Sequence, residues 1–179
     1  LERATLNDTT VGTRGAQPFE LWIYLAFDAG DSFYDNPTRE AEVRLWLESH
    51  MVAPLAAAGI GAQHALLRFD NTMHKPGPAF NFMMAAAAED GADYLYRIND
   101  DTEFATAWLP TAVRTMQSYT PPNVGVAGPV CNEGNTKILT HDFVHRTHLQ
   151  IFEFYYPPIL SDWWMDDWIT HVYGPQRTT

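Results

Sequence analysis

The residues that could do chemistry begin where a short apolar run, residues 94–98, ends. Asn99, Asp100 and Asp101 follow one another there, with a further carboxylate at Glu103. The apolar run is typical of a buried strand, and open α/β sheets bind ligands at the carboxyl ends of their strands. Mg²⁺ and Mn²⁺ prefer oxygen ligands and commonly share a substrate's phosphates. The pattern indicates a divalent-metal site, with a polar turn that caps the next helix as the alternative.

A second group lies at residues 161–168, where three tryptophans and three aspartates fall together. Aromatic rings stack on the C–H faces of sugars, and carboxylates accept hydrogen bonds from sugar hydroxyls. The spacing predicts a helix over 163–173, with a carbohydrate-binding face at its start. The alternative is a core helix that is anchored by tryptophan and has its acids on the solvated side.

The elements that must position these residues alternate along the chain. Four apolar runs predict strands: 21–27, 65–69, 94–98 and 124–130. Helical patterns separate them: one begins at 36–38 and is stopped by Gly59 and Gly61, and the others cover 79–88 and 105–119. Residues 143–154 predict a strand that runs into a helix. This alternation predicts an α/β fold with a mostly parallel sheet and helices on both faces.

Composition limits the classes of function. The chain has 179 residues, and we expect an N-terminal arm at 1–18 followed by a single domain at 19–179. Its net charge of −11 argues against binding to a nucleic-acid backbone, which needs a basic face. No apolar run is long enough to predict a transmembrane segment. The single cysteine, Cys131, excludes an internal disulfide.

Two parts of the sequence together resemble a known family. Residues 75–81, Lys-Pro-Gly-Pro-Ala-Phe-Asn, precede a short helix and then the run 92–102. This order resembles the nucleotide-sugar glycosyltransferases of the GT-A fold, in which a Gly-Pro-Ala-type loop and an Asn-bearing helix precede a strand that ends in Asp-x-Asp. Residues 21–174 can be laid on that pattern in order. The chain departs from it at Asn99, where the first aspartate of the motif usually stands.

The resemblance implies a GT-A-like, Rossmann-like domain that uses Mn²⁺ or Mg²⁺ and transfers a sugar, with inversion, from a nucleoside-diphosphate sugar. UDP-sugar is the expected donor, and a glycan or another hydroxyl compound is the acceptor. Asp101 is the first expected metal ligand, with Glu103 and the late histidine His171 as further ligands. The residues expected to contact the donor are Asp28, Asp31, Lys75, Asn81, Asn99 and Asp100. For Asp31 and Lys75, an ordinary exposed loop position is the alternative.

The acid pair Asp166-Asp167 resembles the pair that holds the acceptor and supplies the catalytic base late in GT-A chains. Adjacent helical residues point about 100° apart, so only one of the two can face the acceptor. We expect Asp167 to take the proton and Asp166 to orient or bind a neighbouring hydroxyl, while His141-Asp142 is a further candidate for the acceptor side. Two alternatives remain: a GT-A-like domain without catalysis that acts as a binding or structural subunit, and a sugar-binding module.

Overall fold

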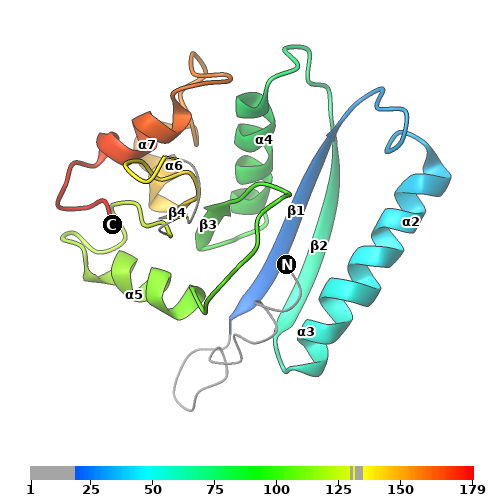
Figure 1. The fold of residues 1–179 in the computed structure, drawn as a ribbon, viewed down its shortest axis with the longest axis horizontal. Coiled ribbons are helices and arrows are strands. Elements are labelled where there is room, and N and C mark those ends of the chain that lie inside the picture. Colours follow the sequence, from blue (N-terminus) through cyan, green and yellow to red (C-terminus); the bar gives the residue numbers. More distant parts are fainter. Residues whose placement is uncertain (1–18, 130, 132–134) are drawn as a thin grey trace. The chain divides into compact units, whose positions relative to one another are not determined.

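A computed structural model describes residues 19–129, 131 and 135–179, so the predicted arm at 1–18 lies outside the described residues. The protein has an α/β fold in which helices accompany two small sheets (Figure 1). The described residues divide into two compact units, one comprising 19–74 with Glu103–Ala107, the other Lys75–Thr102 with the described part of Trp108–Thr179. The span that was predicted as one domain, 19–179, thus contains two compact units.

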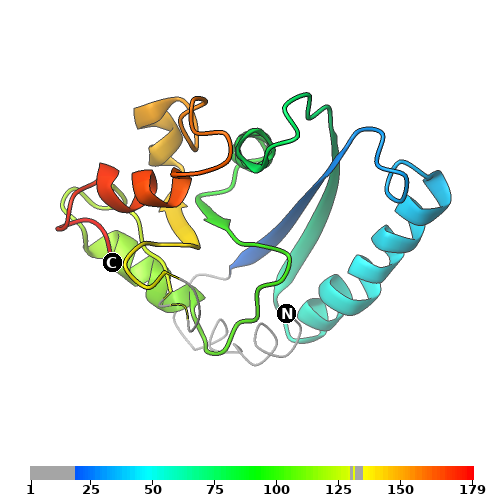
Figure 2. The ribbon, with the colours of Figure 1, turned by 45° about the horizontal axis from the view of Figure 1, so that its top comes forward.

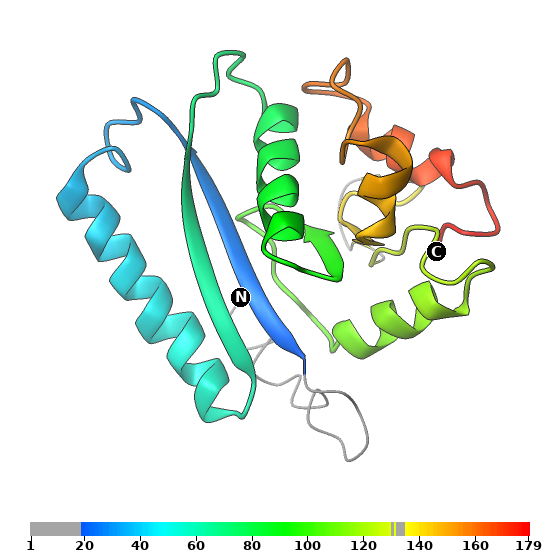
Figure 3. The same ribbon diagram turned by 180° about the vertical axis from the view of Figure 1, so that it is seen from behind.

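The first unit is built on a parallel strand pair. β1 (Glu20–Asp28) and β2 (Gly61–Phe69) pair in register from Glu20 opposite Gly61 to Asp28 opposite Phe69. The crossover between them is helical along most of its length: α2 (Pro37–Leu47), a π-helical turn η2 (Glu48–Val52) and α3 (Ala53–Ala57). Figure 3 shows this helical segment running alongside the two strands. This strand–helix–strand unit confirms the prediction for the first part of the chain.

Local sequence explains where the crossover begins and ends. The Asn36 side chain accepts hydrogen bonds from the backbone N–H groups of Thr38 and Arg39, which caps α2 at its start. At the other end, Gly59 adopts a φ of 80°, which a glycine tolerates without strain. Leu47 and Leu55 from the helices and Leu66 from β2 are buried. The apolar side of the helical segment therefore forms part of the core of this unit.

The second unit contains a helix before its sheet and three helices after the sheet's first strand. Its elements are α4 (Pro76–Glu89), β3 (Tyr94–Arg97), α5 (Leu109–Ser118), β4 (Asp142–His145), α6 (Thr147–Phe152) and α7 (Met165–Val172). β3 and β4 are antiparallel, with Tyr94 opposite His145 and Arg97 opposite Asp142. The predicted strand that runs into a helix at 143–154 corresponds to β4 and α6.

The prediction of one mostly parallel sheet is wrong in this second unit. Residues 124–129 form isolated bridges rather than a strand, with Val126 beside Thr178 and Ala127 beside Phe143. Two glycines explain why: a Cβ at Gly125 would meet the Tyr119 ring at 2.4 Å, and one at Gly128 would meet the His141 carbonyl oxygen at 2.4 Å. The segment is therefore held by close backbone approaches on two sides, and β3 pairs with β4 instead.

The core of the second unit is unusually aromatic. Val144 of β4, Ile169 of α7 and Tyr156 in the segment between α6 and α7 are each 0 % exposed. α6 and α7 lie side by side (Figure 2), and Trp168 of α7 packs against the Phe152 ring of α6 with 5.2 Å between ring centroids. Buried His148 bonds through its Nδ1 to the Tyr173 hydroxyl at 2.7 Å and through its Nε2 to the Tyr155 carbonyl at 2.8 Å. This histidine has a structural role.

Candidate functional site

The acidic turn leaves β3 directly after a buried arginine. Arg97, the last residue of β3, has only 5 % of its side chain exposed, whereas Asn99, Asp100 and Asp101 are exposed. Behind the turn, Thr102 Oγ1 is 2.9 Å from Nε2 of His141. The strand therefore delivers the three polar side chains to the surface at its carboxyl end, as the sequence predicted.

Arg97 is held by a buried acid and two tyrosines. Its Nε donates to Asp142 Oδ1 at 3.2 Å and to the Tyr156 hydroxyl oxygen at 2.9 Å. Asp142 is fully buried, and it accepts hydrogen bonds from the hydroxyls of Tyr155 and Tyr156, each at 2.5 Å. A buried ion pair needs such additional hydrogen bonds to offset the loss of water around both charges. The opposite charges are therefore well satisfied at this position.

The ionisation of the network follows from these contacts. Burial pushes the pKa of Arg97 down, but the neighbouring Asp142, Tyr156 and Asp166 outweigh burial and hold the pKa above its usual value. Burial, with the charge of Asp142, raises the pKa of both Tyr155 and Tyr156 well above the usual value. The arginine thus stays charged, and both tyrosines keep the protons that they donate to Asp142.

The remaining nitrogens of Arg97 reach both groups that the sequence singled out. Its Nη1 donates to Asn99 Oδ1 at 3.3 Å, and its Nη2 donates to Asp166 Oδ1 in a short ion pair. Asp166 and Asp167 lie in the first turn of α7, as expected. Residues from the acidic turn and from the head of α7, far apart in the sequence, thus meet on one guanidinium.

Asp166 and Asp167 differ in their surroundings. Asp166 has 34 % of its side chain exposed. Burial raises its pKa, and the Asp142 and Asp167 charges add to this, while Arg97 opposes it. Asp167 is partly exposed and forms no ion pair with another of the described residues. The structure therefore assigns the arginine tether to the first acid of the pair.

The three tryptophans of this segment fall into two classes. Trp163 is 77 % exposed and Trp164 is 69 % exposed, directly before α7. Trp164 has a φ of 73°, which is uncommon for a residue with a large side chain. Trp168 instead belongs to the aromatic core between α6 and α7. Two tryptophans are thus available to a ligand beside the acid pair, and the third packs in the core.

Two residues predicted to contact the donor have partners in the second unit. Lys75 forms a short ion pair with Asp162. Asn81 accepts hydrogen bonds from the backbone N–H groups of Tyr155, at 3.1 Å, and Tyr156, at 2.7 Å, and its amide donates to the Tyr156 carbonyl at 2.9 Å. These contacts give Asn81 a role in placing the two tyrosines that hold Asp142.

The other two predicted donor contacts, Asp28 and Asp31, belong to the first unit. Asp28 Oδ1, at the end of β1, accepts a hydrogen bond from the Asn71 amide at 3.0 Å. Asp31 Oδ1 accepts from the backbone N–H groups of Phe33 and Tyr34, both at 2.8 Å. Asp31 thus shapes its own loop, the alternative that the sequence had left open for it.

The predicted metal ligands were Asp101, Glu103 and His171, all of which are exposed. Within the described residues, no group of three or more His, Cys, Asp or Glu side chains could hold a metal ion. The three-residue ligand set remains a prediction.

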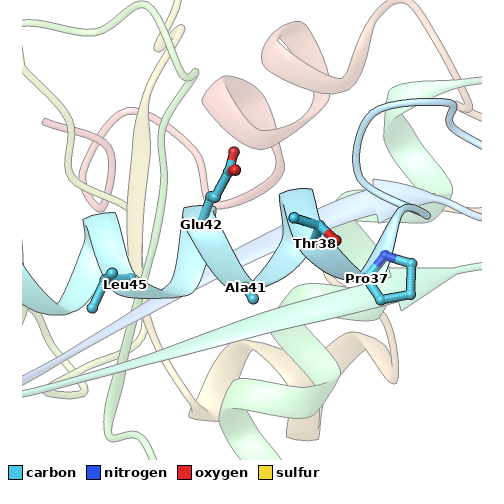
Figure 4. Close-up of a pocket in the computed structure, with 5 residues that line it drawn as sticks. All are labelled: Pro37, Thr38, Ala41, Glu42 and Leu45. Atoms are coloured by element: carbon cyan, nitrogen blue, oxygen red, sulfur yellow. The ribbon is translucent and has the colours of Figure 1, made fainter.

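Two surface hollows lie away from these residues. One of about 490 Å³ runs along the exposed side of α2 in the first unit and is lined by residues of that helix (Figure 4): Pro37, Thr38, Ala41, Glu42 and Leu45. The other, about 230 Å³, lies in the second unit and includes Cys131, Lys137 and Thr170 in its lining. Neither is lined by a predicted site residue, so the polar network around Arg97 is the better guide to function.

Sequence reasoning missed the residues that organise the site. Arg97, Tyr155 and Tyr156 were read as parts of a strand and a turn, and Asp142 was placed on the acceptor side, whereas the structure buries it completely. A signal was present, because Arg97 and Asp142 are charged residues that lie inside or beside apolar runs. Charged residues are almost never fully buried unless paired, so this context indicates that each needs a partner but does not identify that partner.

Comparison of the chain with protein-family models, with curated proteins and with solved structures found no match. Within the described part of the chain, no helix combines the length and apolar character needed to cross a membrane.

Proposed function

We propose that the protein is a metal-dependent glycosyltransferase that transfers a sugar, with inversion, from a nucleoside-diphosphate sugar to a hydroxyl acceptor. A UDP-sugar is the first donor to test. The observation that supports this most is the meeting of Asn99 and Asp166 on the guanidinium of Arg97. It brings the acidic turn, expected on the donor side, together with the acid pair expected on the acceptor side.

On the donor side, Asp101 is the proposed protein ligand of Mn²⁺ or Mg²⁺. It lies exposed in the turn after β3, where a diphosphate could approach. A bound ion would offset the charge that grows on the diphosphate as the bond to the sugar breaks. With Asp101 as the protein ligand, the diphosphate oxygens and water would complete the coordination.

On the acceptor side, Asp167 is the proposed base, which takes the proton of the attacking hydroxyl. Its neighbour Asp166 already gives one carboxylate oxygen to Arg97, so only one acid of the pair is held by the arginine. Trp163 and Trp164, exposed just before α7, offer flat faces on which a sugar ring can stack. This arrangement suits an acceptor that is itself a glycan.

The direct test is a screen of sugar nucleotides with Mn²⁺ present, in which release of UDP or GDP is followed with glycan acceptors. Loss of a general base typically lowers the rate by about 10²–10⁴-fold. Asp167→Asn should lower kcat by that order while donor affinity stays close to that of the wild type. Asp93→Asn, a change of the same kind at a 75 % exposed carboxylate, is the matched control. Equal kcat values for wild type and Asp167→Asn would reject Asp167 as the base.

A second candidate is a GT-A-like domain that binds a ligand without turnover. Two observations favour it: Asn99 replaces the first acid of the expected motif, and the described residues contain no three-residue metal group. Calorimetry separates the two candidates. Binding of UDP and Mn²⁺ without product release from any donor and acceptor would support the non-catalytic candidate.

A further inference from the structure

We propose that Arg97 is a positioning residue that couples the acidic turn after β3 to the acid pair at the head of α7. Its role rests on the proposed function, because it places groups on the donor and acceptor sides of that same site. The side chain itself is 5 % exposed, so it acts through the residues that it holds. Neither the family resemblance nor the sequence pattern assigns this role to Arg97.

The geometry gives each nitrogen of the guanidinium a separate task. Nε is fixed by Asp142 and Tyr156, while Nη1 holds Asn99 and Nη2 holds Asp166. A guanidinium is planar and rigid, so fixing one edge fixes the direction of the other two nitrogens. The fully buried Asp142 therefore sets where Asn99 and Asp166 can lie.

The aromatic rings around the guanidinium strengthen this placement. The Cζ atom of Arg97 lies 5.2 Å from the centre of the Phe80 ring and 5.9 Å from that of Tyr156. Phe80 comes from α4, whose Asn81 also holds the backbone at Tyr155 and Tyr156. α4, β3, β4 and α7 thus all contribute to one fixed point in the second unit.

A consequence is that the two acids of the pair, Asp166 and Asp167, have different roles. Asp166 is tethered, so its carboxylate is restricted in direction, whereas Asp167 is left to face a ligand. Loss of the tether lets Asp166 rotate and can displace the first turn of α7. A misplacement of about 1 Å can lower an enzymatic rate by about 10²-fold.

The test uses two variants of the whole chain. Arg97→Lys keeps a positive charge opposite Asp142 but cannot span Asn99 and Asp166 at once, because an ammonium is a single centre. Tyr156→Phe keeps the ring and removes the hydroxyl, which accepts from Nε and donates to Asp142. Asp142 still contacts Nε in this variant, so it is the milder change for Arg97. Arg114→Lys on the exposed side of α5 is the matched control.

Two readouts are measured, kcat for sugar transfer and the pKa of the Asp166 carboxyl by NMR titration, with Asp166→Asn to assign its signal. We expect Arg97→Lys to lower kcat by about 10²-fold with donor KM near wild type. It should also raise the pKa of Asp166 further, because loss of the contact with the Arg97 guanidinium removes a nearby cation that favours the ionised form. Tyr156→Phe should shift both readouts in the same direction by less.

The outcomes separate this proposal from the proposed function. A wild-type protein that turns over no donor rejects the glycosyltransferase, while the NMR titration still decides whether Arg97 holds Asp166. Folded variants with an unchanged pKa for Asp166 and unchanged kcat overturn the positioning role. If both variants fail to fold, the network serves the fold alone and the positioning role is likewise overturned.

Discussion

Asp101 is the exposed carboxylate on which binding of a divalent ion should depend. It lies in the turn after β3, away from the buried contacts of Arg97, so its change to asparagine should leave the fold intact. We expect Asp101→Asn to abolish the part of UDP binding that requires Mn²⁺, because asparagine keeps the shape and removes the charge. Calorimetry of UDP with and without Mn²⁺ measures this.

Asp93→Asn is again the suitable control for Asp101→Asn, since it removes one exposed charge elsewhere in the same unit. Unchanged affinity for UDP with Mn²⁺ in the Asp101 variant would show that the ion, if it binds, uses other ligands.

Substitution of the tryptophans should affect the free energy of unfolding differently at exposed and at packed positions. Trp163 and Trp164 are exposed, so alanine at either position should change the free energy of unfolding by no more than about 0.5 kcal/mol. Trp168 packs against Phe152 and Phe154, and its change to alanine should destabilise the protein by up to about 3–5 kcal/mol. Urea unfolding measures all three variants.

The same variants test acceptor binding. We expect alanine at Trp163 or Trp164 to raise the acceptor KM without altering donor affinity, because only the stacking face is lost. An acceptor KM that stays at the wild-type value in both variants would remove these rings from the binding surface.

At the level of single residues, the sequence predicted the placement of the exposed acids on their elements better than the contacts of the buried charges. The acids at the end of β3 and at the head of α7 stand in short, dense groups, and the structure places both groups where they were expected. The pairing of Arg97 with Asp142 joins β3 to β4, and no local pattern reports a contact between such distant residues. Which acid of the pair is tethered follows only from the contact between Arg97 and Asp166, which also joins residues far apart in the sequence.

Among the elements, α4 carries Asn81, for which donor binding and a structural role predict opposite effects of substitution. Asn81 was predicted to bind the donor, whereas the structure shows its amide on the backbone of Tyr155 and Tyr156. Asn81→Ala leaves these part-buried groups without partners. We expect it to lower the free energy of unfolding by about 1–3 kcal/mol, measured by urea unfolding.

Gln150→Ala, an exposed amide on α6, serves as the control for Asn81→Ala. Loss of UDP binding in a variant with wild-type stability would restore Asn81 to the donor site. Loss of stability with donor binding retained would instead establish its structural role.

The sequence predicted helices and strands correctly where the signals lie within a few residues of the element. β1, α2 and β2 follow from apolar runs, a capping Asn36 and a terminating Gly59, each of which acts within a few residues. The failure at 124–129 has a tertiary cause. Val126 exchanges backbone hydrogen bonds with Arg177 and Thr179, and Ala127 with Phe143, so its pairing depends on segments that come later in the chain.

For the whole molecule, charge decides how a nucleotide can bind. The net charge is −11, and within the described residues Lys75 and Arg97 of the second unit are already paired with carboxylates. For the proposed nucleotide ligand, the net charge of −11 predicts repulsion between the diphosphate and the protein unless a cation offsets it. The same balance argues against binding to a nucleic-acid backbone.

Removal of the divalent ion should therefore be more damaging here than in a basic nucleotide-binding protein. We expect EDTA to weaken UDP binding by at least about tenfold, which corresponds to about 1.4 kcal/mol. Added salt should recover part of that loss, because it screens the repulsion between UDP and the acidic surface. A site that relied on lysine and arginine would respond in the opposite way, since salt would weaken its attraction. Calorimetry with Mn²⁺ or EDTA at two salt concentrations measures both effects, and UDP affinity that is equal with and without the ion would contradict metal dependence.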